Sequence, residues 1–521
     1  MNLKKPTVFM TGATGTMGTA ALEELMKDID KIKLKLLVRD SSKNKSLLSK
    51  YMNNPSIEII WGDLLSYENV LEGVKGSDYI FHIGGMVSPQ CDTKPYLTLK
   101  TNITAVENIT KAILEQENKD NIKLVYIGSV AETGDRNYPR HWGRTGDPIK
   151  ISIYDHYALS KVLAEKHVVE SGIKNWVSLR LSGIVFPNIL KSATAITFHV
   201  PLNGVLEWCT VEDSGTLIRK VLLEDLKGNL GKNFWGRFFN VGSGKEYRLT
   251  NYEFESLTFD CLGMPGVERV FEPNWFATKN FHGHFYYDGD KLEEMLHFRE
   301  TLPVKDYFKR LGTKVSYYLK LGAYIPSFLV APATKMYMKR IAYTKELGTL
   351  DWIYNKNNQR LNVYFGGIEE YNKIPSTWDK FELMKFEKEN SSGEKFICDH
   401  GYDETKNEDD LDINDMKKAA EFRGGECLSE NMNKGDLKSK LKWKCGYCKC
   451  EFEASPCLIL LGGYWCPQCY IPVKQWDYDN IAKSNPFFAQ VWDFNHSKNE
   501  CNVYKFDDLF MKDGIKMDDL Y

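Results

Sequence analysis

A tyrosine and a lysine, four residues apart, are the first pair in this sequence whose types and spacing could do chemistry. Tyr157 and Lys161 lie in SIYDHYALSKVLAEK, residues 152–166, which has a helical pattern. A separation of four places two side chains on one face of a helix, whereas Tyr154 is out of this register. The lysine cation would favour loss of the phenolic proton, whose ordinary pKa is about 10. The pair is either an ordinary surface pair on one helix face or an acid/base that transfers a proton to or from a substrate hydroxyl.

Two polar residues upstream could complete this chemistry. Ser129 ends the strand-like run KLVYIGS, 28 residues before Tyr157, and Asn102 lies in the helix-start pattern TNITAVENI. Taken singly, Ser129 is a strand-end turn and Asn102 is a helix cap. A serine hydroxyl at the end of a strand could also orient a substrate oxygen beside Tyr157.

Four cysteines near the C-terminus form a second chemical pattern. Two Cys-x-x-Cys pairs are separated by 17 residues. Their members are Cys445, Cys448, Cys466 and Cys469. This spacing predicts four thiolates arranged tetrahedrally around one zinc ion, similar to a zinc ribbon. Because protein ligands would fill every position, the zinc would be structural.

The rest of this tail carries weaker signals. Cys450 and Cys457 are interpreted as bystanders, and Cys398, His400 and Cys427 are candidates for part of a second metal site. Lysines cluster between residues 434 and 444 with aromatic residues among them. A solvated or protein-docking surface is favoured there over nucleic-acid contact.

Strands and helices alternate over the first 185 residues and must position the tyrosine and serine. The strand-like runs are TVFMTG, KLKLLVRD, IEIIWGD, YIFHIGG, KLVYIGS and WVSLRLSGIVF. Amphipathic stretches such as TAALEELMKDI separate them. This alternation predicts right-handed βαβ units and an α/β fold, a Rossmann-type doubly wound parallel sheet.

Three glycines follow the first strand-like run directly. Gly12, Gly15 and Gly18 precede a helical pattern, which is the context of a dinucleotide-binding loop. The backbone there would approach a pyrophosphate held at the helix N-terminus. The second run ends in LLVRD, where Arg39 could bind the 2′-phosphate of NADP and Asp40 could serve NAD. NADP is favoured and NAD stays open.

The glycine loop, Asn102, Ser129, Tyr157 and Lys161, in this order, resemble the extended short-chain dehydrogenase/reductase family over about residues 6–310. The resemblance implies that Tyr157 is the acid/base, Lys161 tunes it and holds the nicotinamide ribose, and Ser129 positions the substrate oxygen. Asn102 would be a structural and proton-relay residue. The implied cofactor-binding residues are Thr11, Gly12, Thr14, Gly15, Thr16, Met17, Gly18, Arg39, Asp63, Leu64, Gly84, Tyr157, Lys161 and Pro187.

Four segments are predicted along the chain. They are a dinucleotide-binding domain (1–185), a substrate cap with a helical extension (186–385), a polar acidic linker (386–430) and the zinc-ribbon tail (431–521). Aromatic residues accumulate in the cap: Phe234, Trp235, Phe238, Trp275, Phe276, Phe281 and Phe285. They form either the ordinary core of a cap or a pocket for a large apolar substrate.

Composition limits the class of protein. The formal net charge of −2 argues against a global nucleic-acid-binding field, and no apolar run approaches the roughly 20 residues that span a bilayer. The least polar stretch, residues 318–333, is interpreted as buried helix or loop, with shallow membrane contact as the alternative. The N-terminal apolar run is too short for a signal peptide. We therefore expect a cytoplasmic protein whose 12 cysteines form no disulfide framework.

These observations predict an NAD(P)-dependent oxidoreductase that interconverts a secondary alcohol and a ketone. Within the family it looks most like the 3β-hydroxysteroid/sterol dehydrogenase branch, which implies a large apolar substrate and sometimes a double-bond shift. The alternatives are a nucleotide-sugar epimerase or dehydratase, a dihydroflavonol-type ketone reductase, and a non-catalytic dinucleotide sensor. A protein partner or a homo-oligomer stays open.

Overall fold

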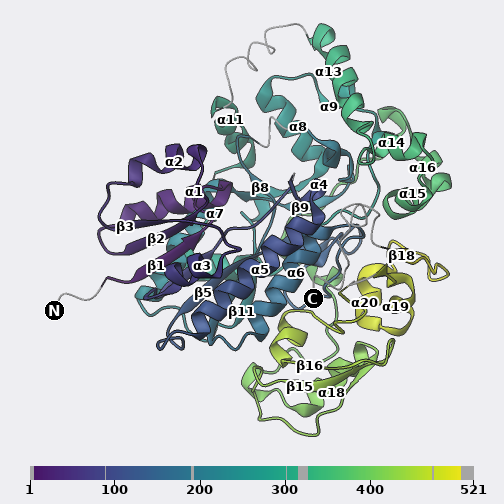
Figure 1. Cartoon of the computed structure of the whole chain (residues 1–521). Helices are drawn as coiled ribbons and strands as arrows, with labels where there is room; N and C mark the ends of the chain where they lie inside the picture. The colour runs from purple at the N-terminus through teal and green to yellow at the C-terminus, as the bar shows by residue number, and fades with distance from the viewer. Residues whose placement is uncertain are drawn as a thin grey trace.

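The centre of the molecule is a parallel sheet of seven strands (Figure 1). The computed structural model describes residues 5–88, 90–188, 193–300, 302–314, 327–471 and 475–505. The strand order is β11-β7-β5-β4-β1-β2-β3. These strands are β1 (Thr7–Thr11), β2 (Lys33–Val38), β3 (Ile57–Trp61), β4 (Tyr79–His82), β5 (Lys123–Ser129), β7 (Asn175–Leu181) and β11 (Arg237–Val241). The predicted fold class, a Rossmann-type doubly wound α/β sheet with a cap and a small C-terminal module, is confirmed.

Helices cover both faces of the sheet, which explains why its strands read as continuous apolar runs. In β1, Phe9 enters one core while its neighbours Val8 and Met10 enter the other, and all three are fully buried. Helices α1 (Thr16–Leu25) and α7 (Val211–Leu226) supply one core. Helices α3 (Tyr67–Val74), α5 (Pro95–Leu114) and α6 (His156–Glu170) supply the other.

One edge of the sheet comes from a segment that the sequence placed in the cap. The chain leaves the sheet after β7, forms the short strand β8 (Ile184–Val185), and later returns through α7 to β11. β11 pairs in parallel with β7, with Phe239 opposite Leu179. Hydrophobic periodicity reports local structure only, so it could not show this return. The domain boundaries themselves remain a prediction.

The cap is built from short strands and helices around aromatic cores. Its elements include β9 (Val205–Glu207), β12 (Arg248–Thr250), α8 (Asn251–Leu262), α9 (Val267–Val270), β13 (Phe285–Tyr286), α11 (Val304–Lys314), α13 (Ser327–Ala342), α14 (Thr349–Tyr354), α15 (Asn358–Phe365) and α16 (Ile368–Lys373). Phe198, Phe271, Trp275 and Phe276 pack together in one cluster. Of the seven aromatic residues noted in the sequence, all but the half-buried Phe281 belong to packed clusters. Packing therefore explains them without a large apolar ligand.

The C-terminal part of the chain, from about residue 396 onward and called the tail from here on, lies against the sheet domain (Figure 1). It contains α18 (Ile413–Phe422), the antiparallel sheet β14 (Gly425–Cys427), β15 (Leu441–Cys445) and β16 (Glu451–Ala454), a short π-helix (Cys457–Leu461), α19 (Tyr478–Ser484) and α20 (Pro486–Trp492). One hydrophobic cluster joins tail residues such as Leu460 and Tyr464 to Leu159 and Val162 of α6. Within the segment expected to be a linker, Cys398, Met416 and Arg423 are buried.

The segment predicted to be buried or membrane-contacting, residues 318–333, falls partly outside the described residues. Residues 327–333 of it begin α13. Among the residues that the structure describes, no helix is both long and apolar enough to cross a membrane.

Candidate active site

The glycine loop joins β1 to α1 and requires glycine at two positions. Gly12 has φ of +76°, and a Cβ there would lie 2.6 Å from the backbone nitrogen of Gly84. A Cβ on Gly18 would lie 1.9 Å from the Gly12 carbonyl oxygen. Gly15, the N-cap of α1, and Thr16, its first residue, are both exposed, so the helix begins at the surface. This geometry suits a pyrophosphate at the helix N-terminus.

The end of β4 passes directly beside this loop. The Thr11 hydroxyl accepts a hydrogen bond from the Gly84 backbone nitrogen at 3.0 Å and lies 2.9 Å from Nδ1 of His82. A Cβ on Gly85 would lie 3.0 Å from Oδ1 of Asn102 and 4.0 Å from Nζ of Lys161. Two consecutive glycines thus leave room between the loop and Lys161.

The ends of β2 and β3 carry the residues that were assigned to the adenosine half of the cofactor. Arg39 and Asp40 are exposed, and Asp40 forms an ion pair with Lys45 at 2.6 Å. Asp63 accepts a hydrogen bond from the Leu65 backbone nitrogen at 2.9 Å. These positions line the same carboxyl edge of the sheet as Gly12. The choice between NAD and NADP remains a prediction.

Tyr157 and Lys161 lie in the first turns of α6, at the carboxyl end of β5. Asp155 begins the helix by accepting a hydrogen bond from the Ala158 backbone nitrogen at 2.8 Å. Nζ of Lys161 donates to the Ile127 carbonyl oxygen at 2.8 Å. Ser129 ends the same strand, and its side chain lies near that of Tyr157 and lowers the pKa of that tyrosine. The structure therefore brings together the serine, tyrosine and lysine that the sequence singled out.

The protonation of this pair is set mainly by burial. Burial raises the pKa of Tyr157, and the nearby Ser129 side chain opposes this shift. Burial lowers the pKa of Lys161 to about 8, while the carboxylates of Glu132 and Glu165 act in the opposite direction. Tyr157 therefore holds its proton at neutral pH and can donate it to a carbonyl oxygen, and Lys161 is close to its titration point.

Asn102 and Pro187 are placed differently from the serine and tyrosine. The Asn102 side chain accepts from the Met86 nitrogen at 2.7 Å and donates to the Ser160 hydroxyl at 2.8 Å. It thus ties the segment after β4 to α6, which is the structural half of its predicted role. Pro187 follows β8 and is half-buried, and residues 189–192 next to it lie outside the described part of the chain.

Sequence reasoning missed a buried ionic cluster directly behind Ser129 and Lys161. Glu132 accepts from the Ser129 backbone nitrogen at 2.8 Å, and Arg180 binds Glu165 with bonds of 2.7 and 3.0 Å. Burial raises the pKa of Glu132, and the charge of Glu165 adds to this. Burial would also raise the pKa of Glu165, but the charge and hydrogen bonds of Arg180 outweigh burial and lower it. The spacing Ser129-x-x-Glu132 is a capping-box signature, so this glutamate was detectable.

Polar groups also surround Tyr157 on the side of α4 (Gln90–Thr93) and the cap. The charge of Asp155 raises the pKa of Tyr157, and burial raises the pKa of the nearby Cys91 thiol. Asp155 also lies 3.1 Å from Nδ1 of His282, which belongs to the cap. Asp92 accepts a hydrogen bond from the Cys91 thiol at 3.2 Å, and burial raises the pKa of Asp92. A substrate at Tyr157 would meet carboxyl, thiol and imidazole groups.

The four cysteines converge, far from this site in the sequence. Their sulfur atoms all lie within 4.8 Å of one another, with Cys445 and Cys469 at 3.6 Å and Cys448 and Cys466 at 3.4 Å. Four sulfurs at 2.3 Å from one zinc ion lie about 3.8 Å apart, so the arrangement fits a tetrahedral site.

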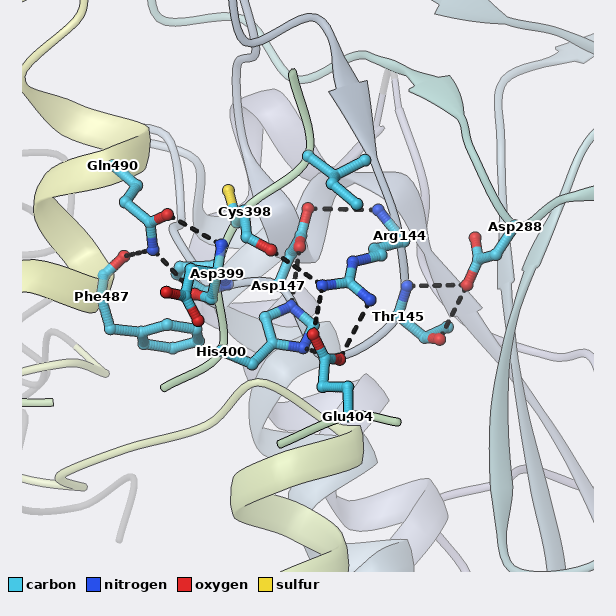
Figure 2. A network of polar contacts seen from close by, with 12 residues as sticks. Arg144, Thr145, Asp147, Asp288, Cys398, Asp399, His400, Glu404, Phe487 and Gln490 are labelled. Carbon is cyan, nitrogen blue, oxygen red and sulfur yellow. Dashed lines mark hydrogen bonds and ion pairs between the residues drawn. The ribbon is translucent and has the colours of Figure 1, made fainter. Parts of the chain in front are cut away.

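The candidate second metal site does not form. Figure 2 shows His400 inside an ion-pair network, 3.0 Å from Asp147 and 2.8 Å from Glu404. Both ring nitrogens thus face carboxylates. Cys398 accepts a hydrogen bond from Arg136, and within the described residues the quartet is the one cluster that could hold a metal. These residues instead join the loop before α6 to the tail.

Comparison with known proteins finds relatives for the first part of the chain. Residues 8–198 match the NAD dependent epimerase/dehydratase family. Among curated relatives, UDP-glucose 4-epimerase of Rickettsia bellii (strain RML369-C) is 34% identical over 112 residues, which is 20% of this chain and 32% of the relative. The same enzyme of Rickettsia conorii (strain ATCC VR-613 / Malish 7) is 30% identical over 115 residues, 21% of this chain and 33% of the relative. The matches span about a third of these relatives' length.

Solved structures that resemble this chain cover about 59% of it. dTDP-glucose 4,6-dehydratase from Bacillus anthracis, in complex with NAD, has a TM-score of 0.45 and 16% identity and covers 59% of this chain and 96% of its own. UDP-glucose 4-epimerase from Thermus thermophilus, in complex with NAD, has a TM-score of 0.44 and 17% identity and covers 59% and 98%.

Proposed function

We propose that this chain is an NAD(P)-dependent enzyme that acts on a sugar nucleotide, as an epimerase or a dehydratase. The observation that carries the proposal is the convergence of Ser129, Tyr157 and Lys161 at the carboxyl edge of the sheet, where the glycine loop also lies. The match of residues 8–198 to an epimerase/dehydratase family supports it. So do the relatives named UDP-glucose 4-epimerase.

A sugar suits the surroundings of Tyr157 better than a sterol does. Asp92, Asp155 and His282 can exchange hydrogen bonds with sugar hydroxyls, whereas a hydrocarbon ring would exclude water from these polar groups and give no hydrogen bond in return. The cap aromatics that favoured an apolar substrate are used in packing. The nucleotide-sugar alternative therefore replaces the sterol dehydrogenase as our leading hypothesis.

The residues have separable tasks in such a reaction. Bound NAD(P) would accept a hydride from the sugar carbon and return it. Tyr157 exchanges the proton of the reacting hydroxyl, and Ser129 holds that oxygen through a hydrogen bond. Lys161, in its charged form, would hold the nicotinamide ribose and stabilise the phenolate. The exposed N-terminus of α1 would hold the pyrophosphate.

The test is a turnover assay that separates net redox chemistry from a cofactor that is recycled. Purified protein is incubated with NAD or NADP and with UDP- or dTDP-glucose, and products are separated by chromatography and identified by NMR. We expect an isomerised or dehydrated sugar nucleotide with no net change in NAD(P)H absorbance. Stoichiometric NAD(P)H formation on a hydroxysteroid, with no sugar-nucleotide product, would favour the simple dehydrogenase instead.

We also propose that the cysteine quartet binds one structural zinc ion. The sulfur spacing fits a tetrahedral site, and all four positions are taken by protein. Elemental analysis should find one zinc per chain in the parent and well under one in Cys448→Ser. The variant Cys501→Ser, which removes an exposed cysteine outside the quartet, should keep its zinc. Equal zinc content in all three proteins would refute the assignment.

A further inference from the structure

The turn Gly462–Tyr464 of the tail lies between α6 and the loop that precedes it. The Gly463 carbonyl oxygen accepts from the Ile149 backbone nitrogen at 3.1 Å. A Cβ on Gly463 would lie 1.8 Å from the Asp147 carbonyl oxygen, so the two backbones are in contact. The Tyr464 hydroxyl lies 3.0 Å from the Val162 carbonyl oxygen, one residue after Lys161. The tail therefore covers the catalytic helix at the level of its first turns.

The same turn adds two hydrogen bonds to a buried ion pair. The Tyr464 hydroxyl donates to Oε2 of Glu165 at 2.8 Å, and the Gly462 carbonyl oxygen accepts from Nη2 of Arg180 at 2.8 Å. Glu165 and Arg180 have no more than 1% of their side-chain surface exposed. Buried charges are stable only when their remaining hydrogen-bonding groups are satisfied. Two of the groups that satisfy this pair come from the tail.

The ion pair continues to the serine and the lysine. Nε of Arg180 lies 3.2 Å from Oε2 of Glu132, whose other oxygen accepts from the Ser129 backbone nitrogen. Glu165 follows Lys161 by one helical turn, so it is on the same side of α6. A displacement of the Glu165 carboxylate would thus reach both Ser129 and Lys161.

We infer that Tyr464 is a positioning residue of the active site, acting through Glu165 and Arg180, and that the tail is part of the support of that site. This inference rests on the proposed function, but it concerns a segment outside the matched residues 8–198. Tyr464 precedes the ligand Cys466 by two residues, so the zinc site fixes the turn that carries it. The tail would then be required for turnover without contacting substrate.

The test compares Tyr464→Phe with Tyr470→Phe. Tyr470 is equally buried, but its hydroxyl accepts from Asn485 within the tail. We expect Tyr464→Phe to lower kcat about 10-fold, because small misplacements of catalytic groups are costly, while KM stays within about two-fold. Zinc content should stay at one per chain in both variants, and Tyr470→Phe should keep its kcat.

A double-mutant cycle separates positioning from general destabilisation. If Tyr464 acts through Glu165, the variant Glu165→Gln combined with Tyr464→Phe should be no slower than Glu165→Gln alone. The inference would be overturned if the effects of Glu165→Gln and Tyr464→Phe on kcat multiplied in the double variant. It would also be overturned if Tyr464→Phe and Tyr470→Phe lowered kcat equally. If the parent turns over no sugar nucleotide, the proposed function is wrong. In that case NADH affinity tests whether Tyr464 positions the site. We expect Tyr464→Phe to bind NADH about three-fold more weakly than the parent, and Tyr470→Phe to bind it like the parent. An unchanged affinity in Tyr464→Phe would overturn the inference.

Discussion

Gly18→Ala tests the glycine loop, because the structure leaves no space for a methyl group there. The new Cβ would lie 1.9 Å from the Gly12 carbonyl oxygen, whereas real Cβ contacts are at least 3.0 Å. The loop must therefore move by about 1 Å, away from the position in which Gly12 approaches a pyrophosphate. Overpacking of this kind costs about 1–3 kcal/mol. Expressed as binding, this is a loss of about 5- to 150-fold in affinity.

The assay is a fluorescence titration with NADH and NADPH, together with thermal unfolding. Gly231→Ala is the matched control, since a Cβ at Gly231 would meet nothing within 4 Å. We expect the control to bind both dinucleotides like the parent, and Gly18→Ala to lose affinity while still folding. If Gly18→Ala binds as tightly as the parent, the loop does not approach the cofactor and the reasoning is refuted.

Three further predictions concern charges. Burial would raise the pKa of Asp147, but the hydrogen bond to His400 and the charges of nearby arginines outweigh burial. They lower this pKa from the ordinary 3.8 to about 2. The stability it contributes is therefore full above pH 3.8 and is lost as the pH falls through 2. In urea unfolding, the free energy of unfolding of the parent should be about 1 kcal/mol lower at pH 3 than at pH 5, and this difference should be absent from Asp147→Asn. The same pH dependence in both proteins would contradict this prediction. Arg39→Ala should weaken NADPH binding at least about 10-fold more than NADH binding; an unchanged ratio would exclude Arg39 as the 2′-phosphate ligand. Burial lowers the pKa of Lys161 to about 8, so its positive charge is lost above that pH. The NADH affinity of the parent should therefore fall between pH 7 and pH 9, while that of Lys161→Met should not change over this range. An equally flat profile in the parent would refute the role of Lys161.

The sheet domain was predictable because its signals are local. The run TVFMT is apolar on both sides because Phe9 and Met10 face separate cores, and the glycines follow it without interruption. Tyr157, Lys161 and Ser129 could be connected because each lies at the carboxyl edge of a predicted strand or the start of the following helix. Glu132 also carried a local signal, its distance of three residues from Ser129.

The contacts of the tail carried no such signal. Tyr464 meets Glu165, 299 residues away in the chain, and neither residue's neighbours indicate the other. The aromatic residues of the cap were ambiguous for a related reason. Phe234 and Phe276 would have the same sequence signature in a core as in a ligand pocket, and only their packing assigns them to cores.

The central claim is that Tyr157 exchanges the substrate proton. Its most direct test is the turnover of Tyr157→Phe on the sugar nucleotide that the parent accepts, beside Tyr154→Phe, which removes a hydroxyl three residues away. Loss of a general acid/base should lower kcat about 10²–10⁴-fold in Tyr157→Phe, with NADH affinity and zinc content retained. Tyr154→Phe should remain within about two-fold of the parent. A kcat of Tyr157→Phe within about two-fold of the parent would contradict the account.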